Sequence, residues 1–240
     1  MQPPNLAVHA PFRAVLFDLD GTLLDTATDI AEALNRAMAE RGWPPIAPGE
    51  VRRMIGRGSP VLIERAAAFQ GHELDEAAIA AMLERFFYHY GFLEESGEFK
   101  AEPYAGAAEC LRALHEAGAR IAVVTNKQKR FATGLLQALA LSDWVDYVVG
   151  GDSYPRRKPD PAPLLFACEQ LGAAPAHALM VGDSTNDVQA ARGAGIPVVC
   201  VPYGYNEGKD PRLLPCDAFV ESLADLPGLL GWEAVANIPD

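Results

Sequence analysis

Apolar residues form a short, uninterrupted run near the beginning of the chain. The run at positions 15–17 is Val-Leu-Phe, and Asp18, Asp20 and Gly21 follow it almost at once. A β-branched and aromatic run of this kind is typical of a strand that is buried on both faces, and the acidic and glycine residues mark its end. The sequence therefore predicts a buried strand that ends in two carboxylates.

Between residues 25 and 100 the apolar positions change to helical spacing. They recur every three or four residues in three segments, 26–41, 59–69 and 75–90, and Gly42 and Gly71 stand where two of these segments stop. No alternating strand pattern interrupts the segments. The stretch is predicted to be entirely helical.

Strand and helix patterns alternate through the rest of the chain. A helix at 105–117 precedes a strand at 120–125, and further β-branched runs follow at 145–150, 178–181, 196–201 and, more weakly, 218–220. Strands that alternate with helices imply a parallel sheet covered on both faces. We therefore predict an α/β fold, with a Rossmann-like parallel sheet core and an all-helical cap inserted after the first strand. The predicted core comprises residues 1–24 and 101–240, and the cap comprises residues 25–100.

Composition narrows the classes of partner. The 240 residues carry a formal net charge of −12, which repels the phosphate backbone of nucleic acids. No apolar run reaches the length of a membrane span, no signal peptide is evident, and the four cysteines are widely scattered. We expect a cytoplasmic protein with reduced thiols that binds neither nucleic acid nor membrane, and that is a monomer or a homodimer. Residues 1–11 are expected to be a flexible lead-in.

Polar side chains follow several of the predicted strands where each strand ends. Thr125 and Asn126 end the second strand, and Lys158 lies before the next helix with a proline after it. Each has an ordinary interpretation, as a helix cap or as part of a solvated loop. Because the carboxyl ends of parallel strands meet at one edge of a sheet, these groups are also placed to bind an anion beside Asp18 and Asp20.

A second pair of carboxylates follows the strand at 178–181. Asp183 and Asp187 are four residues apart at a strand-to-helix junction, where an aspartate can also serve as a helix cap. With Asp18 and Asp20, they would place four carboxylates at one edge of the sheet, where they repel one another strongly. A hard divalent cation with oxygen ligands relieves that repulsion, and a site that also holds substrate phosphate favours Mg²⁺.

These segments resemble the four motifs of the haloacid dehalogenase superfamily over nearly the whole chain. The stretch from Asp18 to Thr22 is similar to the first motif, Thr125 to the second, Lys158 to the third, and Asp183 with Asp187 to the fourth. Within the superfamily, the segments 125–127, 158–161 and 182–187 resemble the phosphoglycolate phosphatases, which also carry a helical cap. The acid at position 20 favours a phosphatase or phosphomutase, because the dehalogenases lack it.

The resemblance implies a Mg²⁺-dependent phosphatase for a small phosphorylated metabolite, with 2-phosphoglycolate as the first candidate. Asp18 would be the nucleophile that forms an aspartyl phosphate, and Asp20 the general acid and base. The metal ligands would be Asp18, the backbone carbonyl of Asp20, Asp183 and Asp187. Substrate would be held by the side chains of Thr125, Asn126 and Lys158.

Three alternatives stay open at this point. A sugar phosphomutase would use the same aspartyl phosphate, a phosphatase for a sugar phosphate, nucleotide or pyrophosphate would use the same core motifs, and a non-catalytic sensor would need neither Asp18 nor Asp20. Substrate choice is expected to depend on the cap. Within the cap, Arg57 lies between two glycines and is a candidate to pair with a substrate carboxylate, although it can also be an exposed loop residue.

Overall fold

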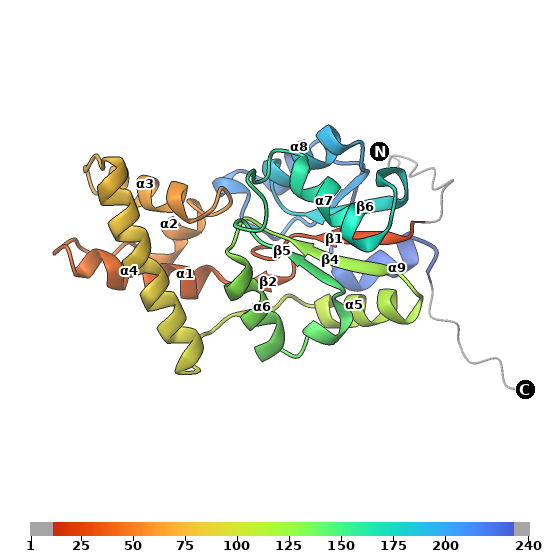
Figure 1. The fold of residues 1–240 in the computed structure, drawn as a ribbon, viewed down its shortest axis with the longest axis horizontal. Coiled ribbons are helices and arrows are strands. Elements are labelled where there is room, and N and C mark those ends of the chain that lie inside the picture. The colour runs from red at the N-terminus through yellow and green to blue at the C-terminus, as the bar shows by residue number, and fades with distance from the viewer. Residues whose placement is uncertain (1–11, 233–240) are drawn as a thin grey trace, which may run out of the picture.

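The computed structural model describes residues 12–232, so the expectation for residues 1–11 lies outside the described part of the chain. A six-stranded parallel sheet forms one end of the molecule and a group of helices forms the other (Figure 1). The strand order is β5-β4-β1-β6-β7-β8. The strands are β1 (Ala14–Phe17), β4 (Arg120–Val124), β5 (Tyr147–Val149), β6 (Ala178–Gly182), β7 (Val198–Cys200) and β8 (Ala218–Phe219).

Helices cover both faces of this sheet. In Figure 1, α7 and α8 lie on one side and α5, α6 and α9 on the other. Strand β1 is fully buried, and its side chains alternate: Val15 and Phe17 pack in the core on one face, Ala14 and Leu16 in the core on the other. The core helices are α5 (Ala107–Glu116), α6 (Lys129–Ala138), α7 (Ala162–Leu171), α8 (Thr185–Ala194) and α9 (Leu226–Leu229), with short 3₁₀ turns at Ser142–Trp144, Pro175–His177, Asn206–Gly208, Pro211–Leu213 and Leu223–Asp225.

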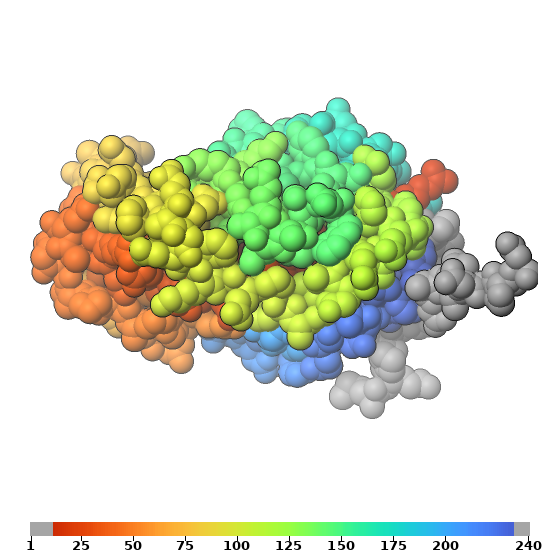
Figure 2. Space-filling view, turned by 90° about the horizontal axis from the view of Figure 1, so that it is seen from below, coloured from red at the N-terminus to blue at the C-terminus, as the bar shows by residue number. Residues whose placement is uncertain are grey.

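The chain between β1 and the rest of the sheet forms a separate helical group. It consists of α1 (Ala27–Ala39), α2 (Pro48–Arg52), α3 (Ser59–Phe69) and α4 (Glu76–Glu95). These helices enclose a second hydrophobic core, to which the sheet domain adds Phe131 and Tyr205. Figure 2 shows α4, in yellow, against the green α6 of the sheet domain, where Tyr90 and Phe131 meet edge to face. The predicted fold class, a parallel α/β core with an inserted helical cap, is confirmed.

Two features of the cap differ from the predicted elements. Helix α2 was not predicted, because its five residues are too few to show a periodic pattern. Helix α4 continues five residues beyond the predicted end at Tyr90, through Gly91, which is buried and has the Phe131 ring nearby. Burial of the helix against α6 outweighs the weak helical tendency of that glycine.

The two connections between cap and core run side by side. Strand β2 (Leu24–Asp25) leads into the cap and β3 (Glu102–Pro103) leads out of it, and they pair as an antiparallel ribbon. Two-residue strands leave no pattern in a sequence, so this ribbon was not predicted. Among residues 12–232, no helix combines the length and apolar character that crossing a membrane requires.

Candidate active site

Three carboxylates meet at the carboxyl edge of the sheet. Asp18 follows β1, Asp183 follows β6, and Asp187 lies in the first turn of α8. One oxygen of each lies within 4.8 Å of an oxygen of the other two. They come together because β1 and β6 are parallel neighbours, as the sequence pattern implied.

Asp187 has both carboxylate oxygens engaged by the surrounding protein. Its Oδ2 accepts hydrogen bonds from the Ser184 backbone N–H at 3.0 Å and from the Ser184 hydroxyl at 2.7 Å, and its Oδ1 accepts one from Lys158 Nζ at 2.7 Å. The Ser184 contacts form a capping box at the start of α8. Asp187, which is completely buried, therefore serves as a helix cap and also belongs to the carboxylate cluster predicted to bind a metal.

Asp183 is held from two sides. Its Oδ1 accepts a hydrogen bond from the Thr22 hydroxyl at 2.9 Å, and its Oδ2 accepts one from the Tyr205 backbone N–H at 2.6 Å. Gly21 has φ +89°, and a Cβ on it would lie 2.6 Å from Asp183 Oδ2. A side chain at position 21 would thus be strained and would also displace this carboxylate, which explains the glycine in the loop after β1.

Lys158 supplies positive charge to the cluster. Its Nζ lies 2.9 Å from Asp18 Oδ1 and 2.7 Å from Asp187 Oδ1, and its side chain is 2% exposed. Burial alone would lower the pKa of this ammonium, but the charges of Asp18 and Asp187 raise it to about 12. Lys158 is therefore a cation that bridges two of the three carboxylates.

The single ammonium of Lys158 does not balance three carboxylates, of which Asp183 and Asp187 are buried and Asp18 is partly exposed. Burial raises the pKa of Asp18 to about 8 against the opposing charge of Lys158, and burial together with the charge of Asp187 raises the pKa of Asp183 to about 7. The ionised cluster thus needs more positive charge than the described residues provide. Its all-oxygen donors fit a hard divalent cation such as Mg²⁺.

Asp20 is not part of the group of three carboxylates. Its Oδ1 accepts hydrogen bonds from the Thr26 hydroxyl at 2.6 Å and from Lys127 Nζ at 2.9 Å. The carboxylate therefore stands beside Asp18 with bonding partners of its own. This agrees with the implied division of roles, in which Asp20 offers the metal only its backbone carbonyl. Sequence reasoning missed Lys127 as its partner; the one available signal was its position directly after Thr125 and Asn126.

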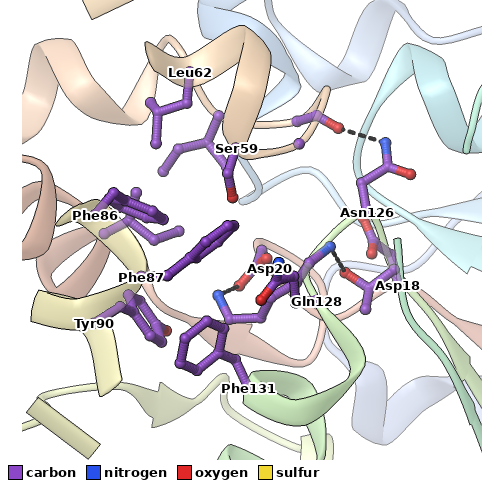
Figure 3. Close-up of a pocket in the computed structure, with 16 residues that line it drawn as sticks. Asp18, Asp20, Ser59, Leu62, Phe86, Phe87, Tyr90, Asn126, Gln128 and Phe131 are labelled. Atoms are coloured by element: carbon purple, nitrogen blue, oxygen red, sulfur yellow. Dashed lines mark hydrogen bonds and ion pairs between the residues drawn. The ribbon is translucent and has the colours of Figure 1, made fainter. Parts of the chain in front are cut away.

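Thr125 and Asn126 also reach this edge of the sheet. Thr125 is buried and follows β4, and its hydroxyl accepts a hydrogen bond from the Lys127 backbone N–H at 3.2 Å. The Asn126 side-chain nitrogen donates to the carbonyl of Gly56 at 3.0 Å (Figure 3). It also donates to the carbonyl of Lys158 at 2.9 Å. Asn126 thereby ties the cap to the loop that carries Lys158, while its predicted contact with the phosphoryl group stays a prediction.

A pocket of about 570 Å³, a volume that includes space open to solvent, lies between cap and core beside these groups. From the cap, Phe86, Phe87 and Tyr90 of α4 and Ser59 and Leu62 of α3 face Asp20 and Phe131 of the core (Figure 3). Such a volume, with apolar walls and a few polar groups, suits a small molecule. The further lining residues are Asp18, Ile30, Ile55, Gly56, Gly58, Thr125, Asn126, Lys127 and Gln128.

Arg57 is not among the residues that line this pocket, although its neighbours Gly56 and Gly58 are. Its side chain is 51% exposed, and its Nε lies 3.7 Å from Glu207 Oε1 of the core. Both glycines have positive φ, +135° and +87°, which carries the chain across the core loops at this point. Its predicted role toward a substrate carboxylate stays a prediction.

Comparisons with known proteins agree with this arrangement. The model of the haloacid dehalogenase-like hydrolase family matches residues 15–201. The chain is 44% identical over 216 residues to a phosphoglycolate phosphatase of Thiobacillus denitrificans, covering 90% of this chain and 94% of the relative. It is 45% identical over 221 residues to one of Nitrosospira multiformis, covering 92% and 96%.

Solved structures show the same fold. A predicted phosphoglycolate phosphatase from Haemophilus somnus superposes with a TM-score of 0.85 at 32% identity, over 92% of this chain and 99% of the other. CbbY from Rhodobacter sphaeroides, solved in complex with phosphate, superposes with a TM-score of 0.76 at 25% identity, over 90% and 96%. By the match to the family model and by this identity to its relatives, the chain belongs to the haloacid dehalogenase-like hydrolase family.

Proposed function

We propose that this hydrolase is a Mg²⁺-dependent phosphatase that cleaves 2-phosphoglycolate through an aspartyl phosphate on Asp18. The observation that carries the proposal is the group of Asp18, Lys158, Asp183 and Asp187 at the edge of the sheet, where Asp18 and Asp20 line a small pocket. The substrate is taken from the relatives, which are named phosphoglycolate phosphatases and match along almost their full length.

Asp18 and Asp20 would act in two successive displacements at phosphorus. An Asp18 oxygen forms a bond to phosphorus while the bond from phosphorus to the ester oxygen breaks, and Asp20 gives its proton to the leaving alkoxide. Asp20, now a carboxylate, takes a proton from a water molecule that attacks phosphorus and releases Asp18. The hydrogen bond from Thr26 and the ion pair with Lys127 hold Asp20 in place for both steps.

Asp18, Asp183 and Asp187 are the side chains that would hold Mg²⁺, with the Asp20 backbone carbonyl as a fourth protein ligand. When bound, the ion would offset the negative charge that nucleophile and phosphate bring together. Lys158, Thr125 and Asn126 would stabilise the phosphoryl oxygens. Asn126 would also hold the loop that carries Lys158 against the cap. Residues 25–100 are assigned to substrate selection.

The proposal is tested by phosphate release from a panel of phosphorylated metabolites, assayed with and without Mg²⁺. We expect the highest kcat/KM for 2-phosphoglycolate, loss of activity on exhaustive chelation, and recovery with Mg²⁺. A higher kcat/KM for another ester would overturn the substrate assignment. A hexose 1-phosphate that is converted to its 6-phosphate, without phosphate release, would establish the phosphomutase instead.

A further inference from the structure

We propose that Lys127 recognises the carboxylate of the substrate and so makes the pocket selective for a carboxylated phosphate ester. The inference rests on the proposed function. Among the described residues that line the pocket, two are acidic, Asp18 and Asp20, and Lys127 alone carries a positive charge. Lys158, the cation of the carboxylate cluster, already pairs with Asp18 and Asp187 and does not line the pocket. A carboxylate that enters beside the phosphoryl group therefore has Lys127 as its available cation.

An unpaired carboxylate would be unfavourable in this pocket. The wall opposite the core groups is formed by apolar and aromatic side chains, among them Leu62, Phe86 and Phe87, which offer no compensating charge. Removing an ionised carboxylate from water without a partner is strongly unfavourable. The pocket thus accepts such a group only next to its one cation.

The Lys127 ammonium is fixed within reach of the position where the carboxylate would lie. Its side chain is 7% exposed, and Nζ lies 2.9 Å from Asp20 Oδ1 and 4.6 Å from the centre of the Tyr90 ring. An ammonium has three N–H donors, of which one is used by Asp20 and a second faces the nearby Tyr90 hydroxyl. A donor therefore remains for a ligand.

The covalent structure of 2-phosphoglycolate matches this geometry. Asp20, as general acid, must lie within hydrogen-bond distance of the ester oxygen. Lys127 Nζ is one hydrogen bond beyond Asp20, and in the substrate a single methylene separates the ester oxygen from the carboxylate. A substrate with its ester oxygen at Asp20 thus brings its carboxylate toward Lys127. This role is the one that sequence analysis assigned to Arg57, which stands outside the pocket lining.

The test compares two esters of similar length, 2-phosphoglycolate and 2-hydroxyethyl phosphate, which has a neutral hydroxymethyl group in place of the carboxylate. The measured quantity is the ratio of their kcat/KM values. Lys127→Gln removes the charge but keeps a donor for Asp20, and Lys127→Met removes both. We expect the ratio to fall by about 10- to 150-fold in each variant, the effect of one charge-assisted hydrogen bond. Lys129→Met, a neighbouring exposed lysine outside the pocket, should leave the ratio unchanged.

A second measurement is independent of turnover. In the Asp18→Asn background, calorimetry gives the dissociation constants of both esters, and Lys127→Gln should weaken binding of 2-phosphoglycolate alone. Thermal unfolding shows whether each variant is folded. If Lys127→Met does not fold, the ratio is compared between Lys127→Gln and the unchanged protein. If both esters lose activity equally in the Lys127 variants, Lys127 only positions Asp20 and the inference fails. If the unchanged protein does not prefer 2-phosphoglycolate, the proposed substrate itself fails.

Discussion

The floor of the active site and the walls of its pocket are built in opposite ways. On the floor, Asp18, Asp183 and Asp187 are fixed by short polar contacts from separate segments, including Thr22, Lys158 and Tyr205. The walls contributed by the cap are mainly apolar side chains of α3 and α4. The floor therefore suits the phosphoryl group common to all phosphate esters, while the walls discriminate by shape and by few charges. Variants of the floor should affect every substrate, and variants of the walls should change the ratios between substrates.

The largest effect is expected from Asp18→Asn, which removes the nucleophile while preserving its shape. We expect kcat to fall by about 10⁴-fold or more for every ester, as with other covalent nucleophiles. Rapid-quench experiments should trap a hydroxylamine-sensitive phosphoenzyme in the unchanged protein and none in the variant. Asp143→Asn, at an exposed acid away from the site, is the control. Unequal losses for different esters would contradict the assignment of Asp18 to a step that all esters share.

A smaller effect on all substrates is expected from Asp20→Asn. The amide can neither donate the proton of the first step nor accept that of the second, which costs about 10²- to 10⁴-fold. The variant should still form the phosphoenzyme from p-nitrophenyl phosphate, whose leaving group needs little protonation, and hydrolyse it slowly. Single-turnover labelling measures both steps. A variant that neither forms nor accumulates phosphoenzyme would contradict the assigned role.

The floor should also link pH to metal binding. Burial raises the pKa values of Asp18 and Asp183 to about 8 and about 7, from the ordinary value of 3.8. Between pH 3.8 and about pH 8, the metal-free folded protein therefore holds more protons on these two groups than the unfolded chain does. Because of this difference, the free energy of unfolding falls as the pH rises through that range. Mg²⁺ binds the ionised carboxylates and should stabilise the protein more at pH 8 than at pH 6.

Thermal unfolding with Mg²⁺ or with chelator, at both pH values, measures this linkage. Asp183→Asn removes one of the two titrating carboxylates. In this variant the rise in Tm caused by Mg²⁺ should therefore differ less between pH 6 and pH 8. A shift with Mg²⁺ that is the same at both pH values would show that the carboxylates are already ionised in the metal-free protein.

A wall variant should act on substrate ratios instead. Phe87 lines the pocket from α4, and Phe87→Ala enlarges it. We expect kcat/KM for p-nitrophenyl phosphate, relative to 2-phosphoglycolate, to rise by about 10-fold, within the range for one apolar contact in a pocket. Phe69→Ala, at a cap phenylalanine that is 55% exposed and does not line the pocket, is the matched control. An unchanged ratio would mean that the cap wall does not select substrates.

The smallest effect is expected where cap and core are joined. Arg52 of α2 donates to the carbonyl of Tyr203 at 2.9 Å, pairs with Asp25 at 3.2 Å and lies over the Tyr205 ring. Arg52→Met should lower the free energy of unfolding by about 1 kcal/mol, seen as a Tm lower by about 2–4 °C, since these groups are partly exposed. Arg53→Met, at the exposed neighbour, should leave Tm unchanged.

The sequence predicted the floor far better than the walls, for a physical reason. Asp18, Thr125 and Asp183 each end or follow a parallel strand, so the fold class alone brings them to one edge. The bond between Lys127 and Asp20 spans 107 positions and depends on how the side chains lie in space. A lysine with its side chain buried needs a partner, but spacing does not say which acid that is.

The cap shows the same limit. Its three longer helices were predicted from their periodicity, and the helical spacing of apolar residues places those of α4 on one face. That Phe87 and Tyr90 of this face also line a pocket follows from the packing of α4 on α6, which no local pattern encodes. The short elements α2, β2 and β3 were missed because two to five residues carry no period.

The paired entry and exit of the cap have a consequence for recombination. Because Leu24 stands opposite Pro103 and Asp25 opposite Glu102, the chain leaves and rejoins the core at adjacent points. An insert of any length that begins and ends close together can be joined at these points without altering the path of the core strands. We therefore expect that the cap of another hydrolase can be joined at this ribbon. The resulting chimaera should acquire the substrate range of that hydrolase while retaining this core.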